Sequence, residues 1–175
     1  MSAQRMAHRK YIARPLRTAI AGCGRRCHLR PPVLNTERMP GTRIPIQIRF
    51  ADVDMAHHVH NAVHLHWFEL ARMELLRRFI PPGHDWKKAG LILARNEMDY
   101  LRPIHLHDCI EAECRAGRIG TKSFDLHYRI MRVTKGATEI CAEGRSVMVC
   151  FDYTEDRTID VPANWRTALE ELTGA

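Results

Sequence analysis

The sequence predicts an α+β fold in which an antiparallel sheet of five strands wraps around one long central helix. Three observations lead to this prediction. Residues 62–80 carry apolar side chains at helical spacing, five other segments have the pattern of strands, and most of these strands are joined by short hairpin-like loops. The chain has 175 residues, of which 45% are hydrophobic, so it is long enough for one domain with one sizeable core.

The first strand is predicted at residues 44–50. Apolar and polar residues alternate there with the period of two that marks a half-buried strand, and the apolar positions are Ile44, Ile46, Ile48 and Phe50. Pro45 has no N–H group to give to a neighbouring strand. The start of this strand is therefore expected at an edge of the sheet.

The long helix is predicted from Ala62 to Ile80. Its apolar residues extend beyond a single stripe, so we expect a helix that is buried over most of its circumference. The Pro81-Pro82-Gly83 sequence ends it, because proline cannot continue a helix. A short polar helix is expected at residues 85–89.

Four further strands and a closing helix complete the fold. The strands are expected at residues 91–101, 110–116, 124–130 and 146–151. Residues 117–121 and 134–137 have the composition of hairpin loops. The closing helix spans residues 162–172, with Pro162 well suited to its first turn. The open edges of such a sheet favour pairing between copies, so we expect a homodimer or homotetramer.

The positive charge of the chain is confined to its N-terminus. The formal net charge is +7, but residues 1–36 contain eight Lys and Arg and no Asp or Glu. Residues 37–175 hold the other 19 of the 27 basic residues and all 20 acidic residues, so their net charge is close to zero. A nucleic-acid-binding fold would carry its positive charge on a folded face, so nucleic acid is not the expected partner. Residues 1–40 are predicted to be a disordered basic extension, and residues 41–175 the folded domain.

Two alternatives for the N-terminus remain open: the true start at Met39, and a transit peptide. No apolar run approaches the roughly 20 residues that a membrane span needs, so we expect a cytoplasmic protein, or an organelle-targeted one if residues 1–36 are a transit peptide. The cysteines of the body fall in strand-like segments, where reduced thiols pack as small apolar groups; they are Cys109, Cys114, Cys141 and Cys150.

The densest group of chemically active side chains lies at residues 49–61, between the first strand and the long helix. It includes Asp52, Asp54 and Asn61, together with three histidines. Free N–H groups at a helix N-terminus stabilise negative charge that develops on a substrate oxygen. A carboxylate beside them can attack a carbonyl or activate water. Asp52 is assigned a structural role, either capping a turn or pairing with Arg49.

The same region resembles a known family. The pattern R-F-x-D-x-D-x-x-x-H-V-x-N at residues 49–61, followed by W-F-E-L-A-R at residues 67–72, resembles the hotdog-fold acyl-CoA thioesterases of the 4-hydroxybenzoyl-CoA thioesterase-like group. The segments Y-L-R-P-I at residues 100–104 and T-K-S-F at residues 121–124, with Asp108, add to this likeness. The resemblance covers residues 44–172.

The resemblance implies a hotdog fold, active sites at a dimer interface, and hydrolysis of an acyl-CoA thioester without a metal. No cofactor is expected beyond the coenzyme A of the substrate. Asp54 matches the family's catalytic carboxylate, as nucleophile or general base, and Asn61 a polar residue that places substrate or water. His57 is a departure, because the family commonly has glycine there.

Further site residues are predicted around these two. Backbone N–H groups around Val59 to Asn61, those of Val59 and His60 foremost, are expected to form the oxyanion hole, and Lys122 and Ser123 to bind substrate. His58 is a catalytic candidate, because an acyl-CoA hydratase would use a histidine beside a carboxylate. His60 and His64 have the spacing of metal ligands on a helix, but no third ligand is evident, so no metal site is predicted.

Other functions remain open alternatives to acyl-CoA hydrolysis. Two of them are hotdog enzymes, an acyl-carrier-protein thioesterase and the acyl-CoA hydratase. The third is a non-catalytic module that binds acyl groups or nucleic acid.

Overall fold

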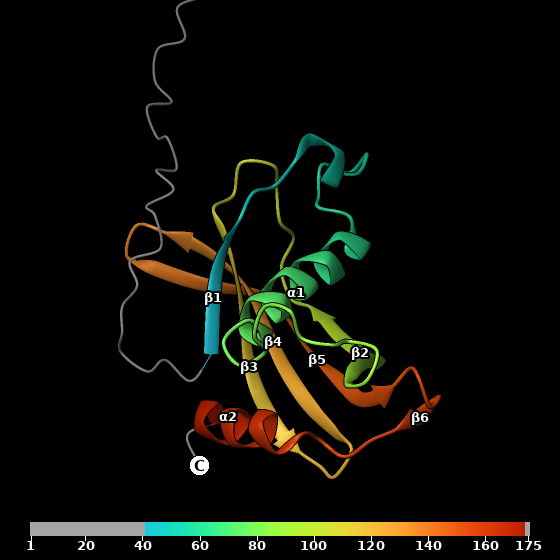
Figure 1. The fold of residues 1–175 in the computed structure, drawn as a ribbon. Helices are drawn as coiled ribbons and strands as arrows, with labels where there is room; N and C mark the ends of the chain where they lie inside the picture. The colour runs from blue at the N-terminus through green and yellow to red at the C-terminus, as the bar shows by residue number, and fades with distance from the viewer. Residues whose placement is uncertain (1–40, 174–175) are drawn as a thin grey trace, which may run out of the picture. The chain divides into compact units, whose positions relative to one another are not determined.

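Six strands form one antiparallel sheet that packs against two helices (Figure 1). The structure is a computed structural model, and it describes residues 41–173; the predicted N-terminal extension lies outside the described residues. In chain order the elements are β1 (Gly41–Ile46), a 3-10 turn (Phe50–Asp52), α1 (Asn61–Leu76), β2 (Gly90–Tyr100), β3 (Ile110–Ile119), β4 (Ser123–Thr134), β5 (Ala137–Asp152), β6 (Arg157–Thr158) and α2 (Ala163–Thr173).

The strand order is β1-β3-β4-β5-β2, with every neighbouring pair antiparallel, so β1 and β2 are the edges. This confirms the predicted antiparallel sheet and the edge position of the first strand. The sixth strand was not predicted. It has only two residues, Arg157 and Thr158, and pairs with the end of β5 after a turn.

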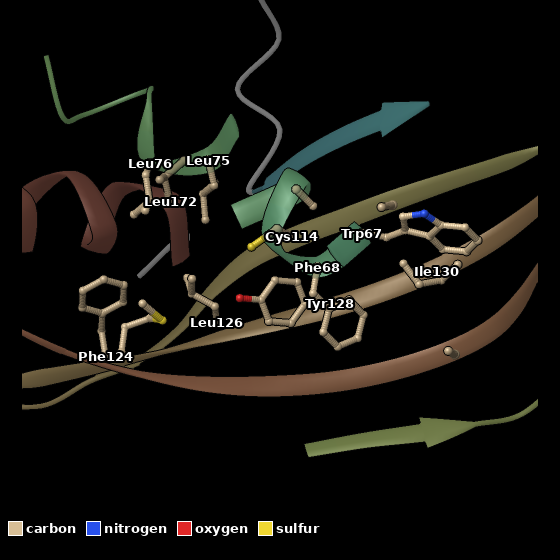
Figure 2. Close-up of a cluster of buried hydrophobic side chains, with 14 of the residues drawn as sticks. Trp67, Phe68, Leu75, Leu76, Cys114, Phe124, Leu126, Tyr128, Ile130 and Leu172 are labelled. Atoms are coloured by element: carbon tan, nitrogen blue, oxygen red, sulfur yellow. The ribbon is translucent and has the colours of Figure 1, made fainter. Parts of the chain in front are cut away.

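The core lies between α1 and the inner face of the sheet. Figure 2 shows Phe68 of α1 against Tyr128 of β4, and the two rings stack with their centroids 4.2 Å apart. Gly144 of β5 allows this approach, because a Cβ there would collide with the Phe68 ring and with the carbonyl oxygen of Glu97. Leu75 of the same helix face is also fully buried.

The closing helix confirms the prediction with a shift of one residue. Pro162 precedes α2, and the helix buries one side, formed by Trp165, Leu169 and Leu172. The Arg166 guanidinium donates to the Gly120 carbonyl at 2.7 Å, which joins α2 to the β3–β4 hairpin.

The predicted first strand is too long. It ends at Ile46, and Phe50 is 86% exposed instead of buried. The reason is the buried carboxylate of Asp52, which accepts hydrogen bonds from the backbone N–H and the guanidinium of Arg49. These bonds turn the chain into a 3-10 helix where alternation alone predicted a continuing strand.

The long helix is shorter and less enclosed than predicted. It ends at Leu76, and residues 77–79 form turns instead of further helix. Because the sheet covers only one side of α1, the apolar side chains of Leu65, Leu70 and Met73 are exposed in the single chain.

Three smaller predictions are also wrong. Residues 85–89 form turns rather than a helix, because Asp85 accepts hydrogen bonds from nearby backbone N–H groups and β2 begins at Gly90.

Strand β5 begins at Ala137 rather than at residue 146, since charged residues on its outer face pair with β4, as Glu143 does with Arg129. Cys109 is exposed, because it lies just before β3 and not within a strand.

No helix among residues 41–173 has the length and apolar content to cross a membrane.

We expect Gly144→Ala to destabilise the fold by about 1–3 kcal/mol, because Phe68 and a strand backbone would both have to move. Thermal unfolding measures this loss. The matched control is Gly117→Ala in β3, where the added Cβ meets mainly the exposed side chain of His127, which can turn away. Equal losses in the two variants would contradict the role of Gly144 in the α1 contact.

Candidate functional site

The chain between the 3-10 turn and α1 folds back around the side chain of Asp54. One carboxylate oxygen, Oδ1, accepts the backbone N–H groups of Ala56 at 2.8 Å and His58 at 3.2 Å. The Asp54 N–H donates to the His58 carbonyl at 2.8 Å, which closes the turn. The other oxygen, Oδ2, receives no hydrogen bond from residues 41–173. The turn therefore holds the carboxylate in place and leaves one oxygen free to react.

His57 occupies an unusual backbone conformation at the tip of this turn. Its φ is +62°, in the left-handed region that glycine adopts without strain. Its N–H donates to the Asp54 carbonyl at 3.0 Å, so the turn closes in spite of the β-carbon. Histidine therefore takes the place that is commonly glycine in the family, and its left-handed backbone conformation costs about 1 kcal/mol.

Asp54 lies on a pocket of about 500 Å³ between two segments that are distant in sequence. One wall is the turn and the start of α1, and the other is the chain that follows β2. The lining residues are Asp54, His58, Val59, His60, Asn61, His64, Tyr100, Leu101, Arg102, Pro103 and Ile104. The structure thus brings together five of the predicted site residues, Asp54, His58, Val59, His60 and Asn61.

The second wall is anchored by Arg132 of β4. Its guanidinium pairs with Asp108 at 3.0 Å and with Glu139 at 2.6 Å, and it also donates to the carbonyl of Pro103. The next residue, Ile104, is buried, and its carbonyl accepts the Val59 N–H at 2.8 Å. Arg132 therefore positions the wall to which the Asp54 turn is hydrogen-bonded through Val59. Sequence reasoning missed this role.

The predicted oxyanion donors are already occupied. The Val59 N–H donates to Ile104, and the His60 N–H donates to the Asp52 carbonyl at 2.8 Å. The first helical residue, Asn61, has a backbone N–H with no acceptor among the described residues. Because α1 begins there, this N–H also lies at the positive end of the helix dipole. Asn61, not Val59 or His60, thus presents the donor that a substrate oxygen can use.

The side chains of His60 and Asn61 support the helix start. The Nδ1 atom of His60 and the Oδ1 atom of Asn61 both accept the N–H of Ala62, at 3.2 and 2.8 Å. The Tyr100 hydroxyl donates to the Asn61 carbonyl at 3.1 Å and ties the end of β2 to the helix. These contacts hold the Asn61 backbone in place at the start of α1.

The ring of His58 contacts that of a second histidine, His105. Its ring lies edge-on to that of His105, with centroids 5.1 Å apart. The distance fits packing of two exposed rings at the entry to the helix, and the His58 backbone, rather than its ring, contacts Asp54.

Sequence reasoning also missed the burial of His64. It is 3% exposed, although it lines the pocket. Burial lowers the pKa of this imidazole, and the backbone carbonyls of His60 and Asn61 oppose that shift only in part. The available signal was its position three and four residues before Trp67 and Phe68, which places it on the apolar side of the helix.

Lys122 and Ser123 are far from Asp54 within one chain. Ser123 is in register with Val149 of β5, whereas the pocket end of β2 is in register with Ala142. Seven residues of strand separate these positions, or roughly 23 Å. The Lys122 amine instead lies 3.4 Å from the Thr158 carbonyl. The single chain therefore does not assemble these two residues with the carboxylate.

Asp52 has the structural role assigned to it. Burial alone would raise its pKa, but the hydrogen bonds and charge of Arg49 outweigh burial, so the pKa of the carboxyl lies below its usual value. Among residues 41–173, no group of three or more His, Cys, Asp or Glu side chains is arranged to hold a metal ion.

Comparison with known proteins gives consistent matches. The model of the thioesterase-like superfamily matches residues 48–169, which include the whole pocket. A thioesterase from Thermus thermophilus, crystallised with coenzyme A and zinc, is 32% identical, with 79% of this chain and 98% of that chain covered and a TM-score of 0.66. A predicted thioesterase from Bacillus stearothermophilus is 27% identical, with coverages of 75% and 95% and a TM-score of 0.67.

A further relative is a CoA-thioester hydrolase. The 1,4-dihydroxy-2-naphthoyl-CoA hydrolase of a Synechococcus strain is 28% identical over 95 residues, which are 49% of this chain and 62% of that protein. The chain thus spans less than two thirds of that relative.

We expect His57→Gly to stabilise the protein by up to about 1 kcal/mol, because glycine removes the strain at positive φ but adds freedom to the unfolded chain. Denaturant unfolding measures the change. Asp156→Gly, at φ +48°, is the matched control and should gain less, since aspartate tolerates this conformation better. A loss of stability in His57→Gly would contradict the strain.

A second prediction concerns acid. Because the pKa of Asp52 is lower in the folded state, its ion pair stabilises the protein above the unfolded pKa of about 4, and the contribution disappears as the pH falls through the folded pKa. We expect Asp52→Asn to be less stable than wild type at pH 7 and the difference to shrink below about pH 4. Unfolding measured from pH 7 to pH 2 tests this, and a constant difference would contradict it.

Proposed function

The chain belongs to the thioesterase-like superfamily, and on that premise we propose that it hydrolyses acyl-CoA thioesters to a free acid and coenzyme A, with Asp54 as the reacting carboxylate. One observation carries the proposal. The free oxygen of Asp54 and the unpaired N–H of Asn61 lie on the same pocket, one suited to attack and the other to a developing oxyanion. The Thermus relative bound to coenzyme A supports the choice of thioester.

In the proposed reaction the thioester carbonyl oxygen accepts the N–H of Asn61. The dipole of α1 adds to the stabilisation of negative charge on that oxygen. In one route Asp54 removes a proton from water as the water oxygen attacks the carbonyl carbon. In the other, Asp54 itself attacks and forms an anhydride, which water then hydrolyses.

Both routes break the same carbon–sulfur bond. In the general-base route it breaks when the adduct with water collapses, and in the nucleophilic route it breaks when the anhydride forms, before water hydrolyses the anhydride. In each case the electron pair leaves with sulfur, and the thiolate later takes a proton. The parent thiol has a pKa of about 8.5 by analogy with cysteine, so the leaving group needs no strong general acid. This chemistry accounts for a site with one reactive carboxylate and backbone donors.

The functional unit is proposed to be a homodimer or homotetramer. Strand β2 is eleven residues long and pairs with β5 on one side only, so its other side can accept a strand from a second copy. The exposed apolar residues of α1, Leu65, Leu70 and Met73, are suited to burial in the same assembly. Because Lys122 and Ser123 lie far from Asp54 in one chain, they can contact its substrate only from another copy. Sedimentation equilibrium tests this assembly, and a monomer at micromolar concentration would overturn it.

We expect Asp54→Asn to lower kcat at least about 100-fold, because asparagine can neither attack the carbonyl nor take a proton from water. The assay is thiol release from short, medium, long and aromatic acyl-CoAs. The control, Asp160→Asn, changes an exposed carboxylate outside the pocket and should keep the wild-type rate. A rate for Asp54→Asn within a few-fold of wild type would overturn the role of Asp54.

Two further readouts separate the remaining routes. Free thiol appears only on hydrolysis, so consumption of an unsaturated acyl-CoA without thiol would indicate hydration instead. Single turnover in ¹⁸O-labelled water that places the label in Asp54 identifies the carboxylate as the nucleophile, with water attacking the aspartyl carbon of the anhydride. Label only in the released acid excludes that course and is expected for the general-base route or for attack of water on the acyl carbon of the anhydride.

A further inference from the structure

All three guanidinium nitrogens of Arg132 in β4 are engaged within the protein. Nε and Nη2 each lie 3.0 Å from Oδ2 of Asp108, and Nη1 donates to Oε2 of Glu139 at 2.6 Å. Nη2 also donates to the carbonyl of Pro103. Arg132 does not line the pocket of Asp54. The guanidinium therefore supports the chain that forms the pocket wall, and its donors are already used for that purpose.

Arg132 and Asp108 together fix the backbone on both sides of Ile104. The Pro103 carbonyl, directly before Ile104, accepts from Arg132. The carboxylate of Asp108 accepts the N–H of His105, directly after Ile104, at 2.9 Å. The Asp108 N–H donates back to the His105 carbonyl at 3.0 Å, which closes a turn. The peptide groups of Ile104 are thus held between two residues that are bound to the same ion pair.

The carbonyl of Ile104 connects this support to the start of α1. It accepts the Val59 N–H at 2.8 Å, and Val59 lies two residues before Asn61. Two residues of chain span at most about 7 Å, so a shift of the Ile104 carbonyl displaces Val59 and with it the Asn61 N–H. An oxyanion donor must lie about 2.7–3.1 Å from the substrate oxygen, and a displacement of about 1 Å can slow a reaction about 100-fold. The placement of the Asn61 N–H therefore depends on Arg132.

The same segment has other anchors, so loss of Arg132 does not release all of it. The N–H groups of Leu101 and Arg102 both donate to the Cys141 carbonyl, at 2.8 and 3.0 Å. The side chain of Ile104 is buried in the hydrophobic core. Removing the guanidinium thus loosens the backbone around Ile104 while the fold stays intact.

We propose that Arg132 is a positioning residue of the thioester hydrolysis, which acts through Ile104 to fix the Asn61 N–H for the developing oxyanion. This inference rests on the proposed function, because it concerns the donor that the thioester oxygen uses there. Replacement of Arg132 should therefore slow the chemical step and leave substrate binding nearly unchanged.

The first test measures thiol release by variants of Arg132. We expect Arg132→Gln to lower kcat about 10- to 100-fold and to change KM by less than about threefold, because an oxyanion donor contributes mainly in the transition state. Arg132→Lys restores the charge but not the planar fork of donors, and should recover part of the lost kcat. The matched control is Arg129→Gln, since this exposed arginine of β4 pairs with Glu143 and does not line the pocket; it should keep the wild-type rate.

A kcat of Arg132→Gln within about threefold of wild type overturns the proposal, and so does a loss of kcat/KM that comes from KM alone. If this variant does not fold, Asp108→Asn takes its place, because asparagine keeps an acceptor for the His105 N–H but loses the charge that Arg132 binds. Asp108→Asn should lower kcat by about 3- to 10-fold at constant KM, and an unchanged kcat overturns the proposal.

Hydrogen exchange of the Val59 N–H tests the structural link without turnover. We expect this N–H to exchange at least about tenfold faster in Arg132→Gln than in wild type, and at the wild-type rate in Arg129→Gln. The Phe68 N–H, in the middle of α1, should exchange equally in all three proteins. If wild type hydrolyses no thioester, the proposed function fails, and equal Val59 exchange in Arg132→Gln and wild type would then overturn the positioning role separately.

Discussion

The hydrogen bond from the Val59 N–H to the Ile104 carbonyl is the constraint on which the candidate site depends. It joins the turn before α1 to the chain after β2, and these segments form the two walls of the pocket. Val59 and His60 donate to carbonyl acceptors, and within residues 41–173 the first helical N–H without an acceptor is that of Asn61. The same bond therefore sets the distance between the walls and determines which backbone group can meet a substrate oxygen.

Ion pairs hold one wall of the pocket in place, and the backbone conformation of His57 shapes the other. Arg132, paired with Asp108 and Glu139, holds the segment that ends in Ile104. On the opposite wall, the left-handed conformation of His57 allows the chain to return around Asp54. The strain there is small beside the hydrogen bonds that the turn gains, so a residue other than glycine is tolerated at its tip. The free oxygen of Asp54 results from this local geometry.

The fold explains why a buried polar side chain, that of His64, lines the pocket. Helix α1 packs Phe68 on Tyr128, and this contact presses one side of the helix onto the sheet. His64 lies one turn earlier and is buried with that side, but at the place where the sheet gives way to the pocket. An apolar residue would satisfy the packing equally well. The imidazole is a buried polar group in a pocket whose other polar lining residues, such as Asp54 and Asn61, are exposed.

The sequence by itself determined the antiparallel sheet and the long helix, because these depend on the period of apolar residues. Its resemblance to a known family at residues 49–61 implied the roles of Asp54 and Asn61, which stay predictions. The sequence could not place the end of β1, since the Asp52–Arg49 pair overrides alternation there. Only the tertiary structure decided which N–H groups are free, how deep His64 lies, and that Lys122 is remote from Asp54. Each of these depends on contacts between segments far apart in sequence, such as Ile104 with Val59, and no local pattern encodes such contacts.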